Sequence, residues 1–407
     1  MPTGVTVSKS NRIFVNYPYW SDDIKFTVAE LDLKSQKEVP FPPKGIDHSL
    51  VGPGAWNTTR QNETLVSVQS VVVDPLDRLW ILDTGRPTIN KTMQPASYGG
   101  PKLIAVALNN NTIVKTIFFP ETVALPQSYL NDIRFDLRIL TQGVAYITDS
   151  SDKGANGIVV VDLETGASWR RLDRHPSTLP TPSFVPSVSG LPIFLQPNAS
   201  APQGYMTDGS DGIALSSDGL RLFYTPLASR RIFSVSTRLL ADPIAGDNDT
   251  ASTVIDHGEK GGTSDGLEAD DQGNIYITNQ DQNAILRGRL VQSPLPKPLP
   301  NAKNNTNATT PAVPPPPVLV LTPFIRDPRI QWADTLSVSA NGRIYFTSNQ
   351  LHLQGKFWKG EDRRQRPFVL FSAPLEKGVR RVELTCETSG LVPCDGSEAG
   401  GELQCRC

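Results

Sequence analysis

Short runs of alternating apolar and polar residues recur along the chain in pairs. Each pair starts at a small or acidic residue, passes through an apolar strand and a turn rich in Asp, Asn and Gly, and ends in an apolar and aromatic strand that closes on a polar residue. A period of two residues is typical of β-strands, because successive side chains point to opposite faces. This unit occurs at residues 3–16, 69–83, 131–149, 210–225, 264–279 and 333–349.

The turns between the paired strands predict tight hairpins. Gly219, Gly273 and Gly342 lie in three of these turns, and glycine readily adopts the positive φ angles that such turns require. Further strand pairs follow most copies, such as 103–108 with 113–118. Four strands per unit, repeated six times, is the pattern of an all-β six-bladed β-propeller. A sandwich or a barrel would not need six equivalent units, so we predict the propeller.

Two segments interrupt the repeat. Residues 291–317 are rich in proline, which cannot donate a hydrogen bond within a sheet, so we expect a surface loop between the third and fourth strands of blade five. Residues 174–203 lie between blades three and four. Long ordered loops often cover a binding face, and a solvated insertion without that role is the equal alternative. We therefore expect a propeller over residues 1–380 and a cysteine-containing tail over 381–407.

The composition narrows the class of protein. The 407 residues carry a net charge of -2, which gives no electrostatic reason to expect nucleic acid or an anionic membrane surface as a partner. No stretch approaches the roughly 20 apolar residues that span a bilayer. An excess of Asn-x-Ser/Thr glycosylation acceptors indicates a secreted protein, and we expect that a leader has been removed before Met1. A cytosolic Asn-rich chain is the alternative. The acceptors are Asn57, Asn62, Asn90, Asn110, Asn198, Asn248, Asn304 and Asn307.

All four cysteines, Cys386, Cys394, Cys405 and Cys407, lie in the last 22 residues. They are therefore too far along the chain to staple the propeller core. Two disulfides within the tail are the natural expectation for a secreted protein. A zinc site of four thiolates is the alternative, but the paired C-x2-C spacing typical of such sites is absent.

The candidate site follows from the predicted fold. The first strand of each blade lines the axis, so the residues that start these strands and those that end the second strands gather on one face. We expect these two rings to contact a ligand through polar side chains and one aromatic side chain. The expected ligand-binding residues are Gln69, Asp83, Asn131, Asp132, Asp149, Asp211, Asn279, Trp332 and Asn349.

Carboxylates that converge on one axis raise one another's pKa, so one of them can stay protonated near neutral pH and act as an acid. Asp265 and Asp334 are the candidate catalytic carboxyls, and His352 is the candidate acid–base histidine. Structural alternatives stay open: an Asp before a strand often caps its own turn, and Trp332 would also fill an axial core.

We expect neither a metal nor a cofactor. No histidine pair has metal-ligand spacing, and the sequence contains no Gly-rich phosphate loop. Calcium, which prefers oxygen ligands such as the axial Asn and Asp side chains, is the alternative.

Several stretches resemble, in the same order along the chain, the yellow / major royal jelly protein family. The resemblance spans roughly residues 3–375 and implies a secreted six-bladed propeller with a ligand tunnel along its axis. Insect members usually carry cysteines inside the propeller, which this chain lacks. Its cysteine tail and proline-rich insertion look more like fungal members. The stretches are Asp74-Pro75 with Leu79–Gly85, Tyr129–Arg134, Ala145–Ser150, Gly209–Leu215 and Thr347–Leu351.

The resemblance implies a small hydrophobic or aromatic organic ligand but offers several functions. The first hypothesis, which rests on the fungal-like tail and insertion, is a cofactor-free cyclase of the hetero-Diels–Alder type that joins a quinone methide to a polyene in terpenoid biosynthesis. A dopachrome-type tautomerase and a non-catalytic binder of aromatic amines are the alternatives. Family membership does not choose among them, because function resides in the site.

Overall fold

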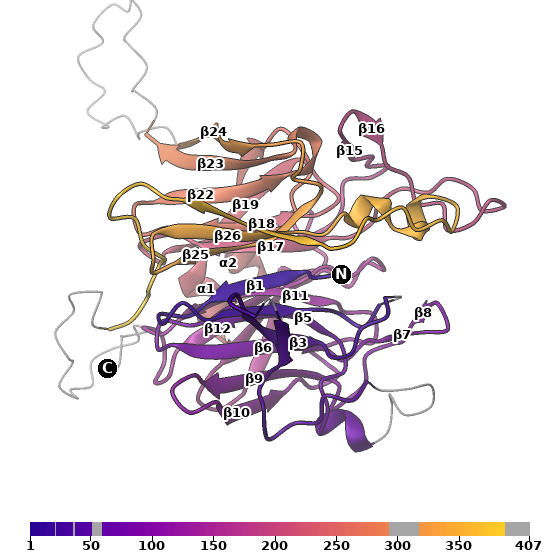
Figure 1. The fold of residues 1–407 in the computed structure, drawn as a ribbon. Coiled ribbons are helices and arrows are strands. Elements are labelled where there is room, and N and C mark those ends of the chain that lie inside the picture. The colour runs from indigo at the N-terminus through magenta and orange to yellow at the C-terminus, as the bar shows by residue number, and fades with distance from the viewer. Residues whose placement is uncertain (21, 36, 51–58, 293–316, 387–407) are drawn as a thin grey trace, which may run out of the picture.

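Six antiparallel sheets stand around a common axis in the computed structural model, which describes residues 1–386 except 21, 36, 51–58 and 293–316 (Figure 1). Blade one consists of β1 (Gly4–Val7), β2 (Ile13–Asn16), β3 (Val28–Asp32) and β4 (Lys37–Pro40). Blade two consists of β5 (Val68–Val73), β6 (Arg78–Thr84), β9 (Pro101–Ala107) and β10 (Thr112–Phe118). Blade three consists of β11 (Leu130–Asp136), β12 (Val144–Asp149), β13 (Gly157–Asp162) and β14 (Ser168–Arg171). Blade four consists of β17 (Ser210–Leu215), β18 (Arg221–Pro226), β19 (Arg231–Ser236) and β20 (Ile255–Glu259). Blade five consists of β21 (Leu267–Ala269), β22 (Asn274–Asn279), β23 (Ala284–Val291) and β24 (Val318–Arg326). Blade six consists of β25 (Ala333–Ser339), β26 (Arg343–Ser348) and β27 (Val369–Pro374).

The innermost strands form a closed ring. Each of β1, β5, β11, β17, β21 and β25 contacts the next, and β25 contacts β1. At that seam the Thr347 hydroxyl donates a hydrogen bond to the Thr3 carbonyl, 3.3 Å away. The ring confirms the predicted six-bladed propeller.

The core is divided into apolar clusters, one at each interface between neighbouring blades. In β12, Val144 and Tyr146 pack toward blade four, whereas Ala145 and Ile147 pack toward blade two. Both faces of such a strand are therefore buried, which explains why the second strand of each blade is apolar nearly throughout. The alternation seen in the sequence sorts side chains between two cores rather than between core and solvent.

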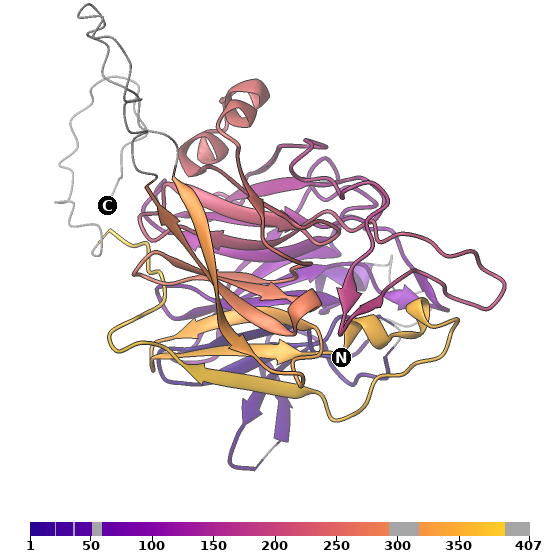
Figure 2. The ribbon, with the colours of Figure 1, turned by 90° about the horizontal axis from the view of Figure 1, so that it is seen from above.

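Several short elements add to the blades. Helices α1 (Thr237–Ala241) and α2 (Asp247–Ser252) contact β19 and lie at the outer edge of blade four (Figure 2). Hairpins β7 (Thr88–Ile89) with β8 (Thr92–Met93) and β15 (Ser187–Val188) with β16 (Leu191–Pro192) project from one face, on the right in Figure 1. The short 3-10 helices are η1 (Thr59–Asn62), η2 (Gln280–Gln282), η3 (Leu351–Leu353) and η4 (Gly355–Phe357). We call β15, β16, η3, η4 and the loops that adjoin them the lid, and the face that bears them the lid face.

The chain after β27 crosses the opposite face. Arg381 forms an isolated bridge with Asp270 in blade five, and its guanidinium donates to the Val73 carbonyl in blade two at 2.8 Å. The Leu384 carbonyl accepts a hydrogen bond from Leu137 in blade three. The expected division at 380–381 thus falls within a segment that packs on the propeller.

Parts of the predicted insertion and tail lie outside the described residues. Strand β23 ends at Val291 and β24 begins at Val318, so the proline-rich insertion lies between the third and fourth strands of blade five. Residues 293–316 and the cysteines Cys394, Cys405 and Cys407 are not among those described. The predicted tail disulfides therefore stay a prediction.

Candidate functional site

Bulges bring aspartates to the axis at the starts of the inner strands. The pairing of β11 with β12, of β17 with β18 and of β25 with β26 shifts register near its start, and Asp132, Asp211 and Asp334 lie inside the shifted segments. A bulge re-aims the side chain that it contains. Asp265 precedes β21 at the matching place in blade five.

A glycine after two of these aspartates allows neighbouring blades to approach. A Cβ atom at Gly212 would overlap the backbone oxygen of Asp265, and one at Gly266 would overlap that of Asp334. The repeated Ser-Asp-Gly sequence therefore has a local reason: the aspartate presents its carboxyl group, and the glycine leaves room for the next blade.

We call Asp211, Asp265 and Asp334 the axial cluster, because their carboxyl groups interact with one another. Asp265 shares a hydrogen bond with Asp211 and accepts another from the indole N–H of Trp332 at 2.6 Å. Asp334 accepts a hydrogen bond from the side-chain amide of Asn349. The three residues are only 4 to 6% exposed.

Burial favours the protonated form of the carboxyl groups in the axial cluster. Burial, reinforced by repulsion from neighbouring carboxylates, raises the pKa of Asp211 and of Asp334 well above the usual range. Burial also raises the pKa of Asp265 to about 7, against the opposing effect of its hydrogen bonds with Trp332 and Asp211. A carboxyl group with such a pKa is able to donate a hydrogen bond or exchange a proton near neutral pH.

Arg134 spans part of the axis beside the cluster. Its guanidinium donates to the Asp132 carboxylate at 3.0 Å and to the backbone oxygen of Leu267 in blade five, and it lies 3.7 Å from Glu268. Burial opposes the charge of Arg134, but the carboxylates of Asp132 and Glu268 prevail and raise its pKa. The Oδ2 atom of Asp132 is buried and has no hydrogen-bond partner among the described residues.

Aromatic side chains lie around the axial cluster. The Trp20 indole donates to the Tyr129 hydroxyl at 2.7 Å, and that hydroxyl donates to the Gln69 side chain at 2.9 Å. On the other side, Trp332 stacks on His352 with a centroid distance of 5.9 Å. Burial lowers the pKa of His352 to about 4, so its imidazole is neutral at pH 7.

The segment between blades three and four packs over this end of the molecule. Phe184, Val188 and Ile193 share an apolar cluster with Trp332 and Phe357. The 3-10 helices η3 and η4 lie on the same side as the β15–β16 hairpin in both views (Figures 1 and 2). Trp332 is therefore packed between the lid and the axial cluster.

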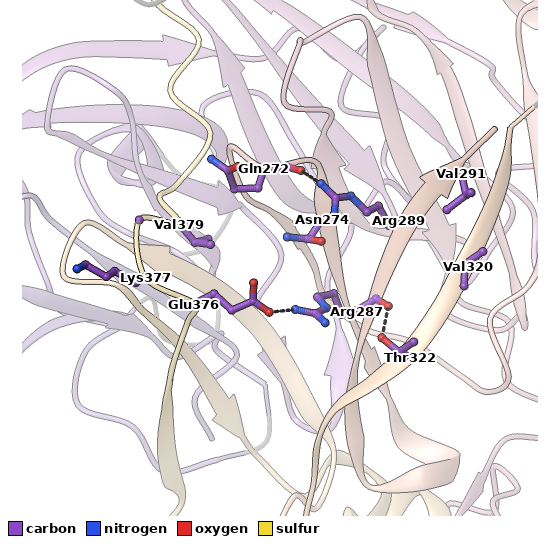
Figure 3. A pocket seen from close by; sticks show the side chains of 11 residues that line it. Gln272, Asn274, Arg287, Arg289, Val291, Val320, Thr322, Glu376, Lys377 and Val379 are labelled. Atoms are coloured by element: carbon purple, nitrogen blue, oxygen red, sulfur yellow. Dashed lines mark hydrogen bonds and ion pairs between the residues drawn. The ribbon is translucent and has the colours of Figure 1, made fainter.

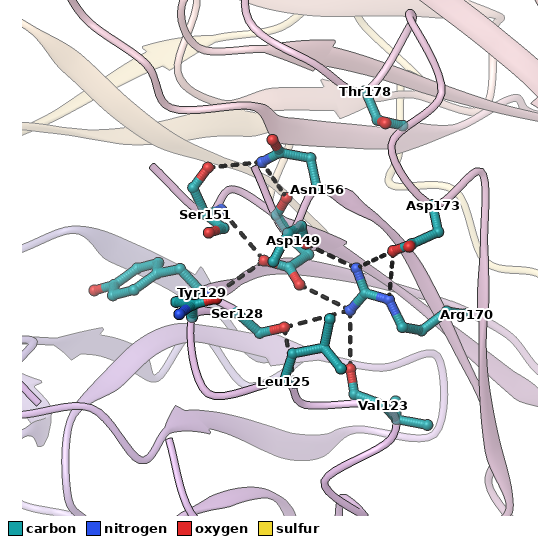
Figure 4. Close-up of polar contacts among 12 residues, drawn as sticks. Val123, Leu125, Ser128, Tyr129, Asp149, Ser151, Asn156, Arg170, Asp173 and Thr178 are labelled. Carbon is teal, nitrogen blue, oxygen red and sulfur yellow. Dashed lines mark hydrogen bonds and ion pairs between the residues drawn. The ribbon is translucent and has the colours of Figure 1, made fainter. Parts of the chain in front are cut away.

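The residues that end the second strands have a different environment. Asp149 accepts hydrogen bonds from the backbone N–H groups of Tyr129 and Ser151 and pairs with Arg170 at 2.8 Å (Figure 4). Asp83 accepts from three backbone N–H groups and pairs with the fully buried Lys102 at 2.8 Å. We call five of these residues the strand-end ring: Asn16, Asp83, Asp149, Thr225 and Asn279. Asn349, at the equivalent place in blade six, donates to Asp334 instead and lies with the axial cluster.

The predicted ligand-binding residues thus separate into two groups. Asp132, Asp211, Trp332 and Asn349 lie with the predicted catalytic Asp265 and Asp334, and Gln69 joins them through Tyr129. His352 lies against Trp332, and its Nδ1 atom is buried without a hydrogen-bond partner among the described residues.

The remaining predicted residues bond to their own loops. Asp83 and Asp149 hold loop backbone and a cation, as described above. Asn279 binds the backbone of Lys260 and Gln282, and Asn131 donates to Ser150.

Sequence reasoning missed Arg134, Glu268 and Trp20. A signal for Arg134 was present, because it follows Asp132 by two residues in an inner strand and so points to the same side. No comparable signal marked Trp20, which comes from the loop after β2 and reaches Tyr129 only in the folded chain.

Two grooves lie away from the axial cluster. One, of about 510 Å3, lies on the outer strands of blade five, where Arg287 pairs with Glu376 at 2.6 Å and Arg289 donates to the Gln272 carbonyl (Figure 3). Its arginines already have partners, so we assign it no role. The other, of about 410 Å3, lies on the lid face.

A family model described as Major royal jelly protein matches residues 66–295, which is more than half of the chain. The chain belongs to this family. Protein yellow of Drosophila melanogaster is 27% identical over 305 residues, covering 70% of this chain and 50% of that protein. Major royal jelly protein 7 of Apis mellifera is 27% identical over 245 residues, covering 57% and 51%. The chain spans about half the length of the curated relatives that it matches.

Among solved structures, a luciferin-regenerating enzyme aligns with a TM-score of 0.48 at 10% identity, over 94% of this chain and 95% of that one. Regucalcin of Agrobacterium tumefaciens aligns with a TM-score of 0.48 at 13% identity, over 95% and 92%. At these identities and TM-scores, the two structures say nothing about the site of this member of the major royal jelly protein family.

Two absences concern the described residues only. Within them, no three His, Cys, Asp or Glu side chains are arranged to hold a metal ion. In the same part of the chain, no helix has the length and apolar character needed to cross a membrane.

Proposed function

We propose that this protein binds a small planar organic molecule beside the axial cluster and rearranges it without a cofactor, as a cyclase of the hetero-Diels–Alder type. The observation that carries the proposal is the buried set of neighbouring carboxyl groups of Asp211, Asp265 and Asp334, with the Asp265 pKa at about 7 and the Trp332 indole in contact. Such a set offers a neutral carboxyl group in a site from which water is largely excluded.

The proposed chemistry needs a hydrogen-bond donor and correct placement. A protonated carboxyl group donates to the oxygen of a quinone methide and so draws electron density from the carbon that the polyene attacks. The C–C and C–O bonds of the new ring form from the π electrons of the two partners, and no atom leaves. Trp332 and Asn349 position Asp265 and Asp334, and holding both partners together contributes through proximity.

Turnover of defined substrates tests the proposal. The purified protein is incubated with a quinone methide generated in place together with a polyene, and the ring product is measured by chiral chromatography. We expect Asp265→Asn and Asp334→Asn to slow product formation by about 100-fold or more, the usual range for loss of a general acid. The rate should fall as the pH rises through about 7, since ionisation of Asp265 removes the donor.

Lys377→Met is the matched control, because this exposed side chain lies in the groove of blade five. If the protein converts dopachrome but not the quinone methide and polyene, the result would instead support the tautomerase. An unchanged rate in both Asp variants would overturn the role of the axial cluster.

A second candidate, a non-catalytic binder of aromatic amines, rests on the charge balance of the same region. Asp132 and the axial cluster contribute four carboxyl groups, whereas Arg134, which pairs with Asp132, contributes one positive charge. A protonated amine would add positive charge next to Trp332 and Tyr129. Binding would lower the carboxyl pKa values and release protons. Calorimetric titration with serotonin in buffers of different ionisation enthalpy detects this release. Tight serotonin binding without any turnover would favour this candidate over the cyclase.

We also propose that the protein is secreted. The glycosylation acceptors among the described residues, Asn62, Asn90, Asn110, Asn198 and Asn248, are all exposed and therefore accessible to modification. Expression with a secretory leader in a eukaryotic host should give a product whose mass falls after treatment with an endoglycosidase. A product of unmodified mass would contradict this proposal.

A further inference from the structure

A groove of about 410 Å3 lies on the lid face between two segments of the lid. Ile193 and Phe194 beside β16 line it from one segment, and Phe357 and Trp358 at the end of η4 line it from the other. The segments are joined through Gln196, whose N–H donates to the Lys356 carbonyl and whose own carbonyl accepts from the Lys359 N–H, each at 2.7 Å. The groove is therefore held in shape by backbone hydrogen bonds.

The groove combines aromatic walls with a cationic rim. The Arg363 guanidinium lies 4.2 Å from the centroid of the Trp358 ring and pairs with Glu361 at 2.7 Å. Lys359 is exposed and has no ion-pair partner among the described residues. One positive charge at the rim is thus left without compensation beside an aromatic surface, and the volume lies in the range of small-molecule sites.

A chain of contacts connects the groove with the axial cluster. The Trp358 indole donates to the His352 carbonyl at 2.8 Å, the His352 ring stacks on Trp332, and the Trp332 indole donates to Asp265. The groove therefore belongs to the same packed unit as the candidate site, although its lining residues are different.

We propose that the groove is a separate binding site for a planar aromatic carboxylate. The ring packs against Phe194 and Trp358, and the carboxylate pairs with Lys359 beside Arg363. An aromatic cation is disfavoured there, because Arg363, 4.2 Å from the centroid of the Trp358 ring, and Lys359 both repel a further positive charge. This inference goes beyond the proposed function and does not depend on it.

Calorimetry with two probes of opposite charge tests the proposal. The probes are 4-hydroxyphenylpropionate and tyramine, which share a phenol ring. We expect saturable binding of the carboxylate and at least about tenfold weaker binding of tyramine. Lys359→Gln should weaken carboxylate binding about tenfold and leave the melting temperature unchanged, because the side chain is exposed. Trp358→Phe should reduce affinity less, since an aromatic wall remains.

The axial variant Asp265→Asn separates this site from the axial one. If the carboxylate binds in the groove, its affinity is unchanged in that variant, whereas cyclase activity is lost if the proposed function also holds. Lys377→Met serves as the control for removal of an exposed charge elsewhere. The inference is overturned if the carboxylate does not bind saturably, if tyramine binds equally well, if Lys359→Gln has no effect, or if Asp265→Asn abolishes binding.

Discussion

The axial cluster and the strand-end ring contain the same kinds of residue on the same face of the propeller, and both are buried, yet their surroundings differ. In the strand-end ring, Asp83 and Asp149 each accept backbone hydrogen bonds and pair with a cation, Lys102 or Arg170. In the axial cluster the carboxyl groups face one another, and their side-chain donors include Trp332 and Asn349. Burial of an aspartate therefore says little about its use until its partners are known.

The difference has a physical basis. A buried carboxylate with several donors and a cation is stable as a charge and holds a loop in place. A buried carboxyl group beside other carboxyl groups is more stable when it keeps its proton. The first arrangement suits structure and the second suits chemistry. Each of the following variants tests one side of this comparison.

Lys102→Met should have the largest effect. It leaves the fully buried Asp83 carboxylate without its cation, which costs about 3–5 kcal/mol of the free energy of unfolding. Urea denaturation at pH 7 measures this loss. Lys377→Met, at an exposed position, should stay within about 0.5 kcal/mol. If Lys102→Met and Lys377→Met had equal stabilities, the ion pair between Lys102 and Asp83 would not contribute to the stability of the fold.

Gly212→Ala should cost about 2 kcal/mol, within the range for overpacking a tight site. The new Cβ atom meets the backbone oxygen of Asp265, which cannot move without shifting the next blade. Urea denaturation at pH 7 also measures this loss in the free energy of unfolding. Gly246→Ala is the comparison. It should cost less, because the nearest atom to its new Cβ is a side-chain oxygen of Asp249. The reverse order would contradict the close approach of the inner strands.

Asn349→Ala should cost about 1–2 kcal/mol, the usual range for a lost buried hydrogen bond. Asn349 donates to Asp334 and thereby opposes the effect of burial on the Asp334 pKa. Its removal raises that pKa further, so the loss of stability should grow as the pH rises through the range in which Asp334 ionises. Thermal melts over a series of pH values test this, and a loss that does not vary with pH would separate Asn349 from the axial cluster.

Asp265→Asn should have the smallest effect on stability, and in the opposite direction. Because the pKa of Asp265 is about 7 in the folded state and about 4 in an unfolded chain, wild-type stability is favoured below pH 4 and declines as the pH rises through 7. The uncharged Asn avoids this decline, which is about 4 kcal/mol for a pKa difference of about three, but it changes the hydrogen bond with Asp211, at a cost of about 1–3 kcal/mol. The variant should therefore gain about 1 kcal/mol or more at pH 8 and gain nothing at pH 4.5. A destabilised variant at pH 8 would show that the Asp265 charge is accommodated after all.

Much of the candidate site was predictable, because the repeat itself aligned the blades. The six copies placed Asp211, Asp265 and Asp334 at equivalent positions, and a propeller brings equivalent positions together. The same reasoning treated Asp83 and Asp149 as equal candidates. Their cations, Lys102 and Arg170, come from outer strands of the same blades, and no local pattern indicated that those side chains would turn inward. Trp20 and the groove beside Trp358 were missed because irregular loops build them.

The sequence by itself determined the number of blades, the hairpin in each and the axial position of the aspartates, since these depend on short-range alternation repeated at intervals. The tertiary structure decided which carboxyl groups meet each other and which meet a cation, and it also placed the lid over Trp332. Those outcomes depend on contacts between residues far apart in the chain, and the free energy of a buried charge is set by such contacts.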